Sequence, residues 1–185
     1  IGVRLVGSEM CIRDSNMPIQ KRVPIIETKR LCLYEMDITD AEGVFQMNNE
    51  KLVMMFTGDK PFSSITKAQE FCETYCPYKA TGIGRWTLRL KENNDYVDWC
   101  GLKKHPNGEV DLGFRLSQKY WGKSLAYEAA SECINYGFNT LDVLQLTARV
   151  HPKNQKSIDL IQRLSFDYQK KSKFRGRSMA ILWNQ

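Results

Sequence analysis

The residues best suited to chemistry lie in one short stretch, QKYWGKSLAYEAA, from Gln118 to Ala130. In it, Gly122 and Lys123 separate a strand-like alternation from a run of small residues typical of a helix. Such a turn leaves free backbone N–H groups at the start of the helix, where the helix dipole favours an anion. Glycine suits the turn because a Cβ restricts φ and the approach of a phosphate. The stretch predicts an anion-binding turn, although one glycine and one lysine also fit an ordinary connection.

The elements that position this turn follow from the apolar pattern. Strands are expected over residues 30–36, 85–92, 96–105, 108–117 and 144–150, helices over 37–56, 63–77, 125–141 and 154–166, and two final strands around Gly176. The segments Asn93–Asp95 and Pro106–Gly108 are turn signals, which predict an antiparallel meander in the middle of the chain. The predicted order is β-α-α-β-β-β-α-β-α-β-β, in one domain over residues 17–185.

The first residues receive a different interpretation. The segment RLVGSEMCIRDS, Arg4 to Ser15, reads like a translated sequencing adapter, so we exclude residues 1–16 from fold reasoning and take Met17 as the natural start. No stretch approaches the roughly 18 consecutive apolar residues of a membrane span. We therefore expect a cytoplasmic protein with no membrane partner.

Charge and cysteine content set further expectations. The formal net charge of +6 suits nucleic acid, an acidic protein or an anionic cofactor, and does not distinguish among them. The basic run from Lys170 to Arg177 is expected to be a hairpin edge, which makes nucleic acid an unlikely partner. Outside residues 1–16 the cysteines lack metal-type spacing, and Cys72 and Cys76 are expected on one helix face. We expect reduced structural thiols, no metal, and a monomer or homodimer.

Two longer stretches carry a family resemblance. DLGFRLSQKYWGKSLAYEAA (residues 111–130) and NQKSIDLIQRLSF (residues 154–166) resemble the strand, turn and helix and the later Asn-x-x-Ser helix of the GNAT acyltransferase superfamily, particularly its ribosomal-protein N-terminal acetyltransferase branch. The resemblance covers Ile26 to Trp183. It implies a mixed α/β (α+β) fold with a twisted mixed sheet of about six to seven strands and about four flanking helices. The central parallel strands, LGFRLS and LTARV, would splay apart after a bulge in the first.

The same resemblance implies a site for acetyl-CoA between the splayed strands. The pantetheine arm would pair with the backbone of Phe114, Arg115 and Leu116 as a false strand. Asn154 would hold the arm from the far side. The pyrophosphate would lie on the backbone amides of Gly122, Lys123, Ser124, Leu125, Ala126 and Tyr127.

Two positions depart from the family pattern. Ser124 and Ser165 stand where the family usually has glycine. The Ser124 hydroxyl is expected to donate to a phosphate or to cap the following helix. The alternative is a weakened cofactor site.

Acyl transfer to an amine needs a base for the amine proton and an acid for the departing thiolate. Asp111 is the candidate base and Ser157 the candidate acid, with a solvated strand aspartate and a helix cap as their structural alternatives. Some relatives carry a glutamate where this chain has Arg149. His105 and His151 are interpreted as isolated.

The acceptor side draws on other residues. Trp86 and Trp99 are possible pocket residues, with core packing as the alternative, and the loop MMFTGDKPF (Met54–Phe62) is the expected acceptor loop. The leading hypothesis is an acetyl-CoA-dependent N-acetyltransferase whose acceptor is a protein N-terminus or a small amine. The alternatives are a degenerate CoA-binding protein without turnover and a basic nucleic-acid-binding module.

Overall fold

The computed structural model describes residues 22–174 and 177–184. The segment 1–16 and the expected start at Met17 lie outside the described residues. Within the described part of the chain, no helix has the length and apolar character of a membrane-spanning segment.

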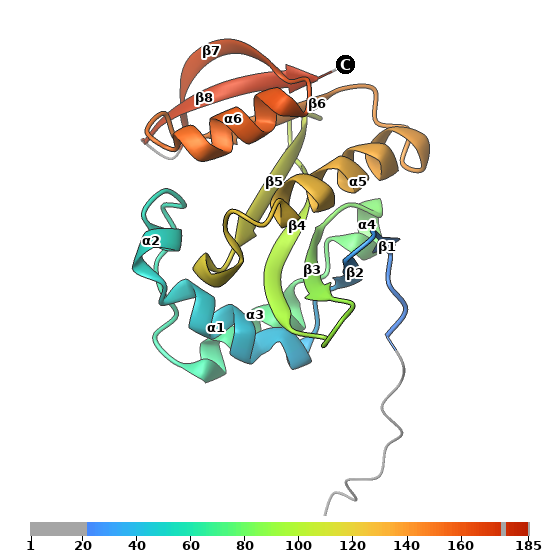
Figure 1. Ribbon diagram of the computed structural model, residues 1–185, viewed down its shortest axis with the longest axis vertical. Helices are drawn as coiled ribbons and strands as arrows, with labels where there is room; N and C mark the ends of the chain where they lie inside the picture. Colours follow the sequence, from blue (N-terminus) through green and yellow to red (C-terminus); the bar gives the residue numbers. More distant parts are fainter. Residues whose placement is uncertain (1–21, 175–176, 185) are drawn as a thin grey trace, which may run out of the picture.

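One mixed sheet forms the centre of the molecule (Figure 1). Its order is β1-β2-β3-β4-β5-β6-β8-β7, and only β5 and β6 pair in parallel. The predicted strands and helices occur in the predicted order, but the structure adds the two-residue β1, which brings the described strands to eight instead of six or seven, and four short α-helices stand where two were expected. The strands are β1 (Ile26–Glu27), β2 (Leu31–Glu35), β3 (Arg85–Leu90), β4 (Tyr96–Lys104), β5 (Val110–Leu116), β6 (Leu146–Val150), β7 (Asp167–Phe174) and β8 (Arg177–Asn184).

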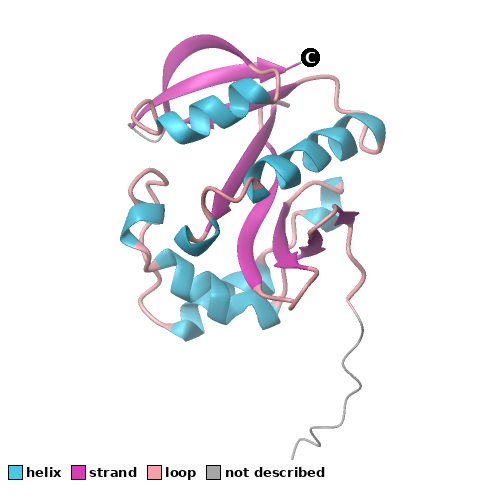
Figure 2. Ribbon diagram, viewed as in Figure 1, coloured by secondary structure: helices cyan, strands magenta, loops and turns pink. Residues whose placement is uncertain are grey.

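The helices flank this sheet (Figure 2). The single helix expected over 37–56 is divided, because the backbone at Glu50 is extended (φ −74°, ψ 102°). Ser64 caps the helix that was expected over 63–77, and its side chain accepts from Lys67 N at 3.3 Å. The helices are the 3-10 helices η1 (Ile38–Asp40) and η2 (Gln118–Tyr120), and α1 (Ala41–Asn48), α2 (Lys51–Met54), α3 (Ile65–Thr74), α4 (Tyr78–Thr81), α5 (Leu125–Asn139) and α6 (Gln155–Arg163).

The cysteines correct one expectation. Helix α3 ends at Thr74, so Cys76 lies outside it and is exposed, whereas Cys72 is buried. The prediction that the two share a helix face is wrong, since the residue before Pro77 disfavours helical backbone. All five described cysteines are free thiols.

Strand alternation assigns the two central tryptophans to opposite faces of the sheet. Trp86 is 1% exposed and packs edge-on against Tyr136 of α5, with ring centroids 5.5 Å apart. Trp99 pairs with Thr87, the residue after Trp86, and therefore points to the face away from α5. The pocket role is wrong for Trp86, which belongs to the core.

Strands β5 and β6 separate after a short ladder. Their parallel pairing ends with Leu112 opposite Ala148, yet β5 continues to Leu116 and β6 to Val150. The predicted splay is confirmed. The bulge expected in β5 is absent from its regular pairing with β4, and the irregularity lies instead between β3 and β4, next to Asp98 (φ 137°).

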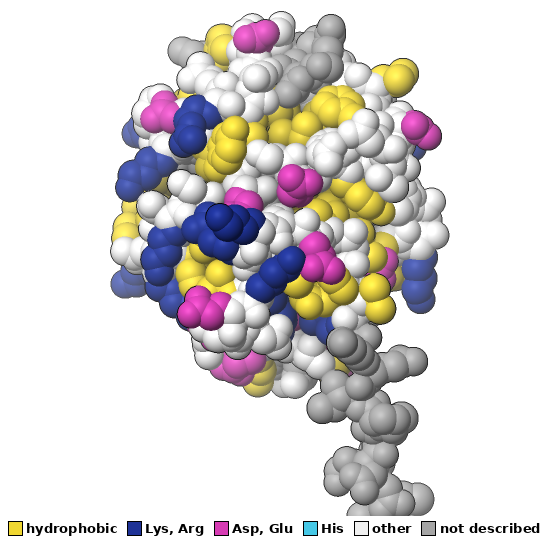
Figure 3. Space-filling view, turned by 45° about the vertical axis from the view of Figure 1, so that its right-hand side comes forward, with side chains coloured by type: hydrophobic (Ala, Val, Ile, Leu, Met, Phe, Trp, Pro, Cys, Tyr) yellow, Lys and Arg dark blue, Asp and Glu magenta, His cyan; other side chains and the backbone are white. Residues whose placement is uncertain are grey.

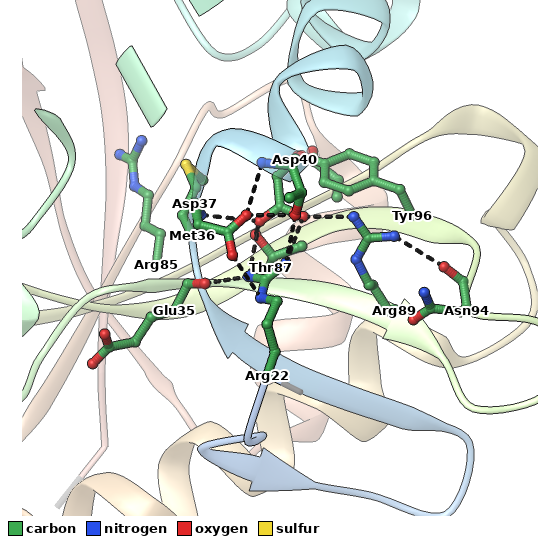
Figure 4. A network of polar contacts seen from close by, with 12 residues as sticks. Arg22, Glu35, Met36, Asp37, Asp40, Arg85, Thr87, Arg89, Asn94 and Tyr96 are labelled. Atoms are coloured by element: carbon green, nitrogen blue, oxygen red, sulfur yellow. Dashed lines mark hydrogen bonds and ion pairs between the residues drawn. The ribbon is translucent and has the colours of Figure 1, made fainter. Parts of the chain in front are cut away.

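A buried carboxylate fastens the start of α1 to the sheet (Figure 4). Asp40 is fully buried and accepts from Arg22 Nη2 at 3.0 Å, Arg89 Nη2 at 2.7 Å and Thr87 Oγ1 at 2.8 Å. Burial alone would raise the pKa of Asp40, but the hydrogen bonds and charge of the two arginines hold it below its ordinary value. This network joins three segments that are far apart in the sequence.

The two serines that replace family glycines keep a glycine-like backbone. Ser124 has φ 59° and Ser165 has φ 64°, both in the left-handed region. Ser165 completes the end of α6, where its N–H donates to Gln162 O at 2.9 Å and Phe166 N–H donates to Ile161 O at 3.3 Å. These two backbone hydrogen bonds form a Schellman motif, which usually has glycine at the position of Ser165.

Replacing either serine by glycine should stabilise the fold. A left-handed backbone conformation costs a residue with a Cβ about 1–2 kcal/mol, which glycine avoids. Glycine's greater entropy in the unfolded chain offsets about 0.5–1 kcal/mol of that gain. Ser124→Gly and Ser165→Gly should therefore each raise the free energy of unfolding by about 0.5–1 kcal/mol. Urea denaturation measures the change. As a control, Ser131→Gly inside α5 should lower stability by about 0.5 kcal/mol. A loss of stability at the two left-handed positions would contradict this.

Candidate active site

The turn after β5 has the geometry of an anion site. Gly122 (φ 73°) and Ser124 (φ 59°) are both exposed and left-handed, and α5 begins directly afterwards at Leu125. The first bond of the helix joins Glu128 N to Ser124 O at 3.1 Å, so the preceding N–H groups have no acceptor within the helix. The Ser124 side chain makes no capping hydrogen bond. The expectation that its hydroxyl caps α5 is therefore wrong.

Two residues that the sequence analysis missed hold this turn in place. Arg30 Nη1 donates to Lys123 O at 3.0 Å, and Arg30 Nε pairs with Glu128 Oε2 at 2.7 Å. Glu128 also accepts from Thr28 Oγ1 at 2.5 Å. Burial would raise the pKa of Glu128, but the hydrogen bonds from Thr28 and Arg30 lower it. The turn is thus tied to the chain before β2.

Lysines from two elements surround the turn. The ammonium groups of Lys119 and Lys123 lie 4.7 Å and 5.6 Å from the Tyr120 ring centroid. Lys156, in the first turn of α6, lies 5.9 Å from the Trp121 ring. The anion-binding turn and the start of α6 therefore face each other across the opening between β5 and β6. Lys119 pairs with Asp95 at 3.9 Å, so Lys123 and Lys156 supply the positive charges at this opening that suit a pyrophosphate.

The face drawn in Figure 3 carries a group of Lys and Arg side chains on its left-hand side. Acidic and apolar side chains lie between and beside them. This face mixes both signs of charge and lacks the continuous basic stripe typical of nucleic-acid-binding proteins.

The predicted arm-binding segment has one unpaired side. Phe114, Arg115 and Leu116 pair with β4 opposite Cys100, Trp99 and Asp98, and no described strand pairs with their other side. Trp121 Nε1 donates to Leu116 O at 2.7 Å, so that carbonyl already has a donor. The segment can still add a strand-like partner at its remaining backbone groups.

The side chain of Arg115 has a separate role. Its Nε lies 2.7 Å from Oδ2 of the fully buried Asp98, and its Nη1 donates to Asn48 Oδ1 at 3.3 Å. Burial raises the pKa of Asp98 to about 7, and the Arg115 charge and the Tyr96 hydroxyl oppose that rise. The Asp98–Arg115 pair lies on the face of the sheet away from α5.

The far side of the opening is formed by α6. Asn154 is its N-cap, and Asn154 Oδ1 accepts from Ser157 N at 3.3 Å. The cap alternative for Ser157 is therefore wrong, because Asn154 performs that role. The amide nitrogen of Asn154 and the hydroxyl of Ser157 have no hydrogen-bond partner in the described part of the chain, so both can meet a ligand.

Asp111 lies in a charged cluster beside the last paired rung of β5 and β6. Its Oδ1 accepts from Arg149 Nη1 at 2.9 Å and Thr147 Oγ1 at 3.4 Å, and its Oδ2 lies 3.8 Å from His105 Nε2. Arg149 also pairs with Glu109. The solvated-aspartate alternative is wrong, and so is the interpretation of His105 as isolated. His151 likewise packs against Phe56 at 5.2 Å between ring centroids.

A pocket of about 260 Å³ opens on the face away from α5. Its polar side chains come from α1, from β3 and β5 and from the loop after α2, and the predicted acceptor loop contributes Asp59, Lys60 and Phe62. Trp99 forms part of its wall. The lining residues are Met36, Val44, Asn48, Asp59, Lys60, Phe62, Phe71, Arg85, Trp99 and Arg115. Within the described residues, no group of three or more His, Cys, Asp or Glu side chains is placed to hold a metal.

Comparisons with known proteins agree with this geometry. Residues 30–167 match the family model described as acetyltransferase (GNAT) domain. An uncharacterized N-acetyltransferase, p20, of Bacillus licheniformis is 30% identical over 142 residues, which cover 75% of this chain and 80% of that protein. Spermidine N(1)-acetyltransferase of Escherichia coli is 23% identical over 128 residues, 69% of this chain and 67% of that protein.

Solved structures share the fold. The ribosomal L7/L12 α-N-protein acetyltransferase RimL, in complex with CoA, superposes with a TM-score of 0.74 at 12% identity, covering 88% of this chain and 97% of that one. Spermidine N-acetyltransferase of Vibrio cholerae, in complex with CoA and spermine, gives 0.68 at 15% identity, covering 83% and 94%. The chain belongs to the GNAT acetyltransferase family.

Proposed function

We propose that this acetyltransferase takes its acetyl group from acetyl-CoA, bound between β5 and β6, and passes it to a primary amine by direct attack. The observation that carries the proposal is the early end of the β5–β6 ladder at Leu112 and Ala148, beside the anion-binding turn. The amides of residues 122–127 would bind the pyrophosphate. The backbone of Phe114–Leu116 and the side chain of Asn154 would hold the arm.

The chain's own residues then manage the protons. The substrate supplies a thioester, whose C–S bond breaks as the amine nitrogen bonds to the carbonyl carbon. Asp111 would take the amine proton, directly or through water. Ser157 would act as the acid by relaying a solvent proton to the departing thiolate, so that its own hydroxyl is restored in the same step. Arg149 holds the Asp111 carboxylate at the closed end of the opening, where the thioester would lie under this proposal.

One observation favours a second candidate, a CoA-binding protein without turnover. Oδ1 of Asp111 already accepts hydrogen bonds from Arg149 and Thr147, so this oxygen is engaged within the protein. Turnover separates the two candidates. We further propose a single domain over residues 17–185 that works in the cytoplasm, where its free thiols stay reduced.

Release of CoA thiol in the presence of amines tests the proposed function. Wild-type protein should release thiol only when both acetyl-CoA and an accepted amine are present. Asp111→Asn should lower kcat by about 100-fold or more with KM for acetyl-CoA little changed, because general-base catalysis contributes about 10²–10⁴-fold. Steady-state kinetics over a pH series measures both.

Glu109→Gln is the matched control for Asp111→Asn. It removes the other carboxylate that pairs with Arg149 and leaves Asp111 in place. Its kcat should stay within a few-fold of wild type. Equal losses in both variants would assign the cluster a structural role, and thiol release by no amine would favour the CoA-binding candidate.

A further inference from the structure

Three residues cross the sheet in one row beneath the pocket. Arg85 of β3 pairs with Gly101 of β4, and Gly101 pairs with Gly113 of β5. Gly113 lies one residue beyond the last rung of the β5–β6 ladder, so the row ends where the strands separate. Strand spacing of about 4.8 Å places the Arg85 backbone about 10 Å from Gly113. An acceptor lying along this row would reach the thioester at one end and Arg85 at the other.

The Arg85 guanidinium lies over an aromatic ring and has no ion-pair partner among the described residues. Its central carbon lies 4.3 Å from the centroid of the Trp99 ring. A Cβ at Gly113 would approach the Trp99 ring to 3.1 Å, so the glycine gives the ring room to lie there. The hydroxyls of Tyr75 and Tyr78 bond to the backbone of Arg85, but no ion pair or hydrogen bond joins its guanidinium to another described residue, and Figure 4 shows the side chain pointing away from the Asp40 network. The ring covers one side of the guanidinium, and its N–H groups have no hydrogen-bond acceptor among the described residues.

The other charges of the pocket do not neutralise Arg85. Arg115 is balanced by Asp98 behind it, at 2.7 Å. Lys60 and Asp59 come from the exposed acceptor loop and carry opposite charges. The three cations Lys60, Arg85 and Arg115 thus face only two carboxylates, those of Asp59 and Asp98, and the pocket keeps a net positive charge beside apolar walls that include Phe62 and Phe71.

We infer that the acceptor is a primary amine that also carries a carboxylate, with the carboxylate bound by the N–H edge of Arg85 against Trp99. This rests on the proposed function, since it assumes that the pocket receives the amine. A planar guanidinium binds a carboxylate through two parallel hydrogen bonds. The same charge repels a polyamine, so the pocket excludes an acceptor such as spermidine.

Matched pairs of amines test this inference. The probes are 4-aminobutanoate with 4-aminobutanamide, L-glutamate with L-glutamine, and spermidine, each assayed by CoA thiol release. For at least one pair, kcat/KM for the carboxylate should exceed that for the amide by at least tenfold. Arg85→Gln should remove that preference, lowering kcat/KM for the carboxylate at least tenfold and leaving the amide within a few-fold.

Two controls accompany the variant. Lys79→Gln removes an exposed positive charge on α4, outside the pocket, and should keep the preference. Arg85→Lys keeps the charge without the planar fork and should retain only part of it. Thermal melting should show that each variant is folded.

The contrary outcomes are distinct. If the amides or spermidine are acetylated as well as the carboxylates, and Arg85→Gln changes nothing, the carboxylate site is wrong and acetyl transfer stands. If no amine releases thiol, the proposed function fails. In that case, melting temperatures are measured with 4-aminobutanoate or L-glutamate. A rise in wild type that disappears in Arg85→Gln supports the anion site, and no rise in wild type overturns the site as well.

Discussion

Asp40→Asn should lower the free energy of unfolding by about 3–5 kcal/mol, the usual cost of removing one partner from a buried ion pair. The carboxylate is fully buried, and its loss leaves Arg22 and Arg89 without their shared counter-charge. For a chain of this size each kcal/mol lowers the melting temperature by about 2–4 °C. Urea denaturation at neutral pH measures the loss.

Glu27→Gln is the control for this substitution. It breaks the Glu27–Lys91 pair, whose side chains are 57% and 36% exposed. Exposed pairs contribute about 0–1 kcal/mol, so its effect should be small. A similar, small effect of Asp40→Asn would show that the Asp40 network does not hold α1 to the sheet.

The difference between wild type and Asp40→Asn should depend on pH. The folded protein lowers the pKa of Asp40, so its contribution is present above the ordinary aspartate pKa of about 3.9 and is lost as the pH falls through the folded value. The two unfolding free energies should therefore converge below about pH 4. A difference that stays constant down to low pH would contradict the assignment.

Gly122→Val should weaken acetyl-CoA binding at least tenfold, which corresponds to about 1.4 kcal/mol. Gly122 has φ 73°, and a β-branched residue is a strong outlier there. A Cβ would meet no atom within 4 Å, so the penalty arises from the backbone and not from a clash. The turn would leave the conformation that presents its N–H groups. Isothermal titration measures the affinity.

Gly108→Val is a matched control for Gly122→Val. Gly108 has φ 87°, with no atom within 4 Å of an added Cβ, and lies in the turn between β4 and β5. The two variants should lose similar stability, but Gly108→Val should bind acetyl-CoA as wild type does. Equal affinity in both variants would remove the turn from the binding site.

Local pattern was enough to predict much of the framework. The start of α5 at Leu125 follows from residues close together in the sequence. The parallel pairing of β5 with β6 was expected instead from the family resemblance. The division of the first helix was not predictable, because neither glycine nor proline marks the break at Asn49 and Glu50. Only tertiary packing distinguishes that segment from a continuous helix.

The parts of the site that depend on register escaped sequence reasoning. Trp86 and Trp99 looked equivalent, and only the pairing of β3 with β4 assigns them to opposite faces. Arg85 reads as an ordinary solvated strand residue until Trp99 is found beneath it. Asp40 and Arg89 are 49 residues apart, so their contact has no local signal.

A crystal structure with acetyl-CoA tests the central claim most directly. We predict pyrophosphate oxygens about 2.7–3.2 Å from backbone nitrogens within residues 122–127, with the pantetheine arm along Phe114–Leu116 between β5 and β6. Acetyl-CoA bound elsewhere, with the backbone beside β5 left empty, would contradict the claim.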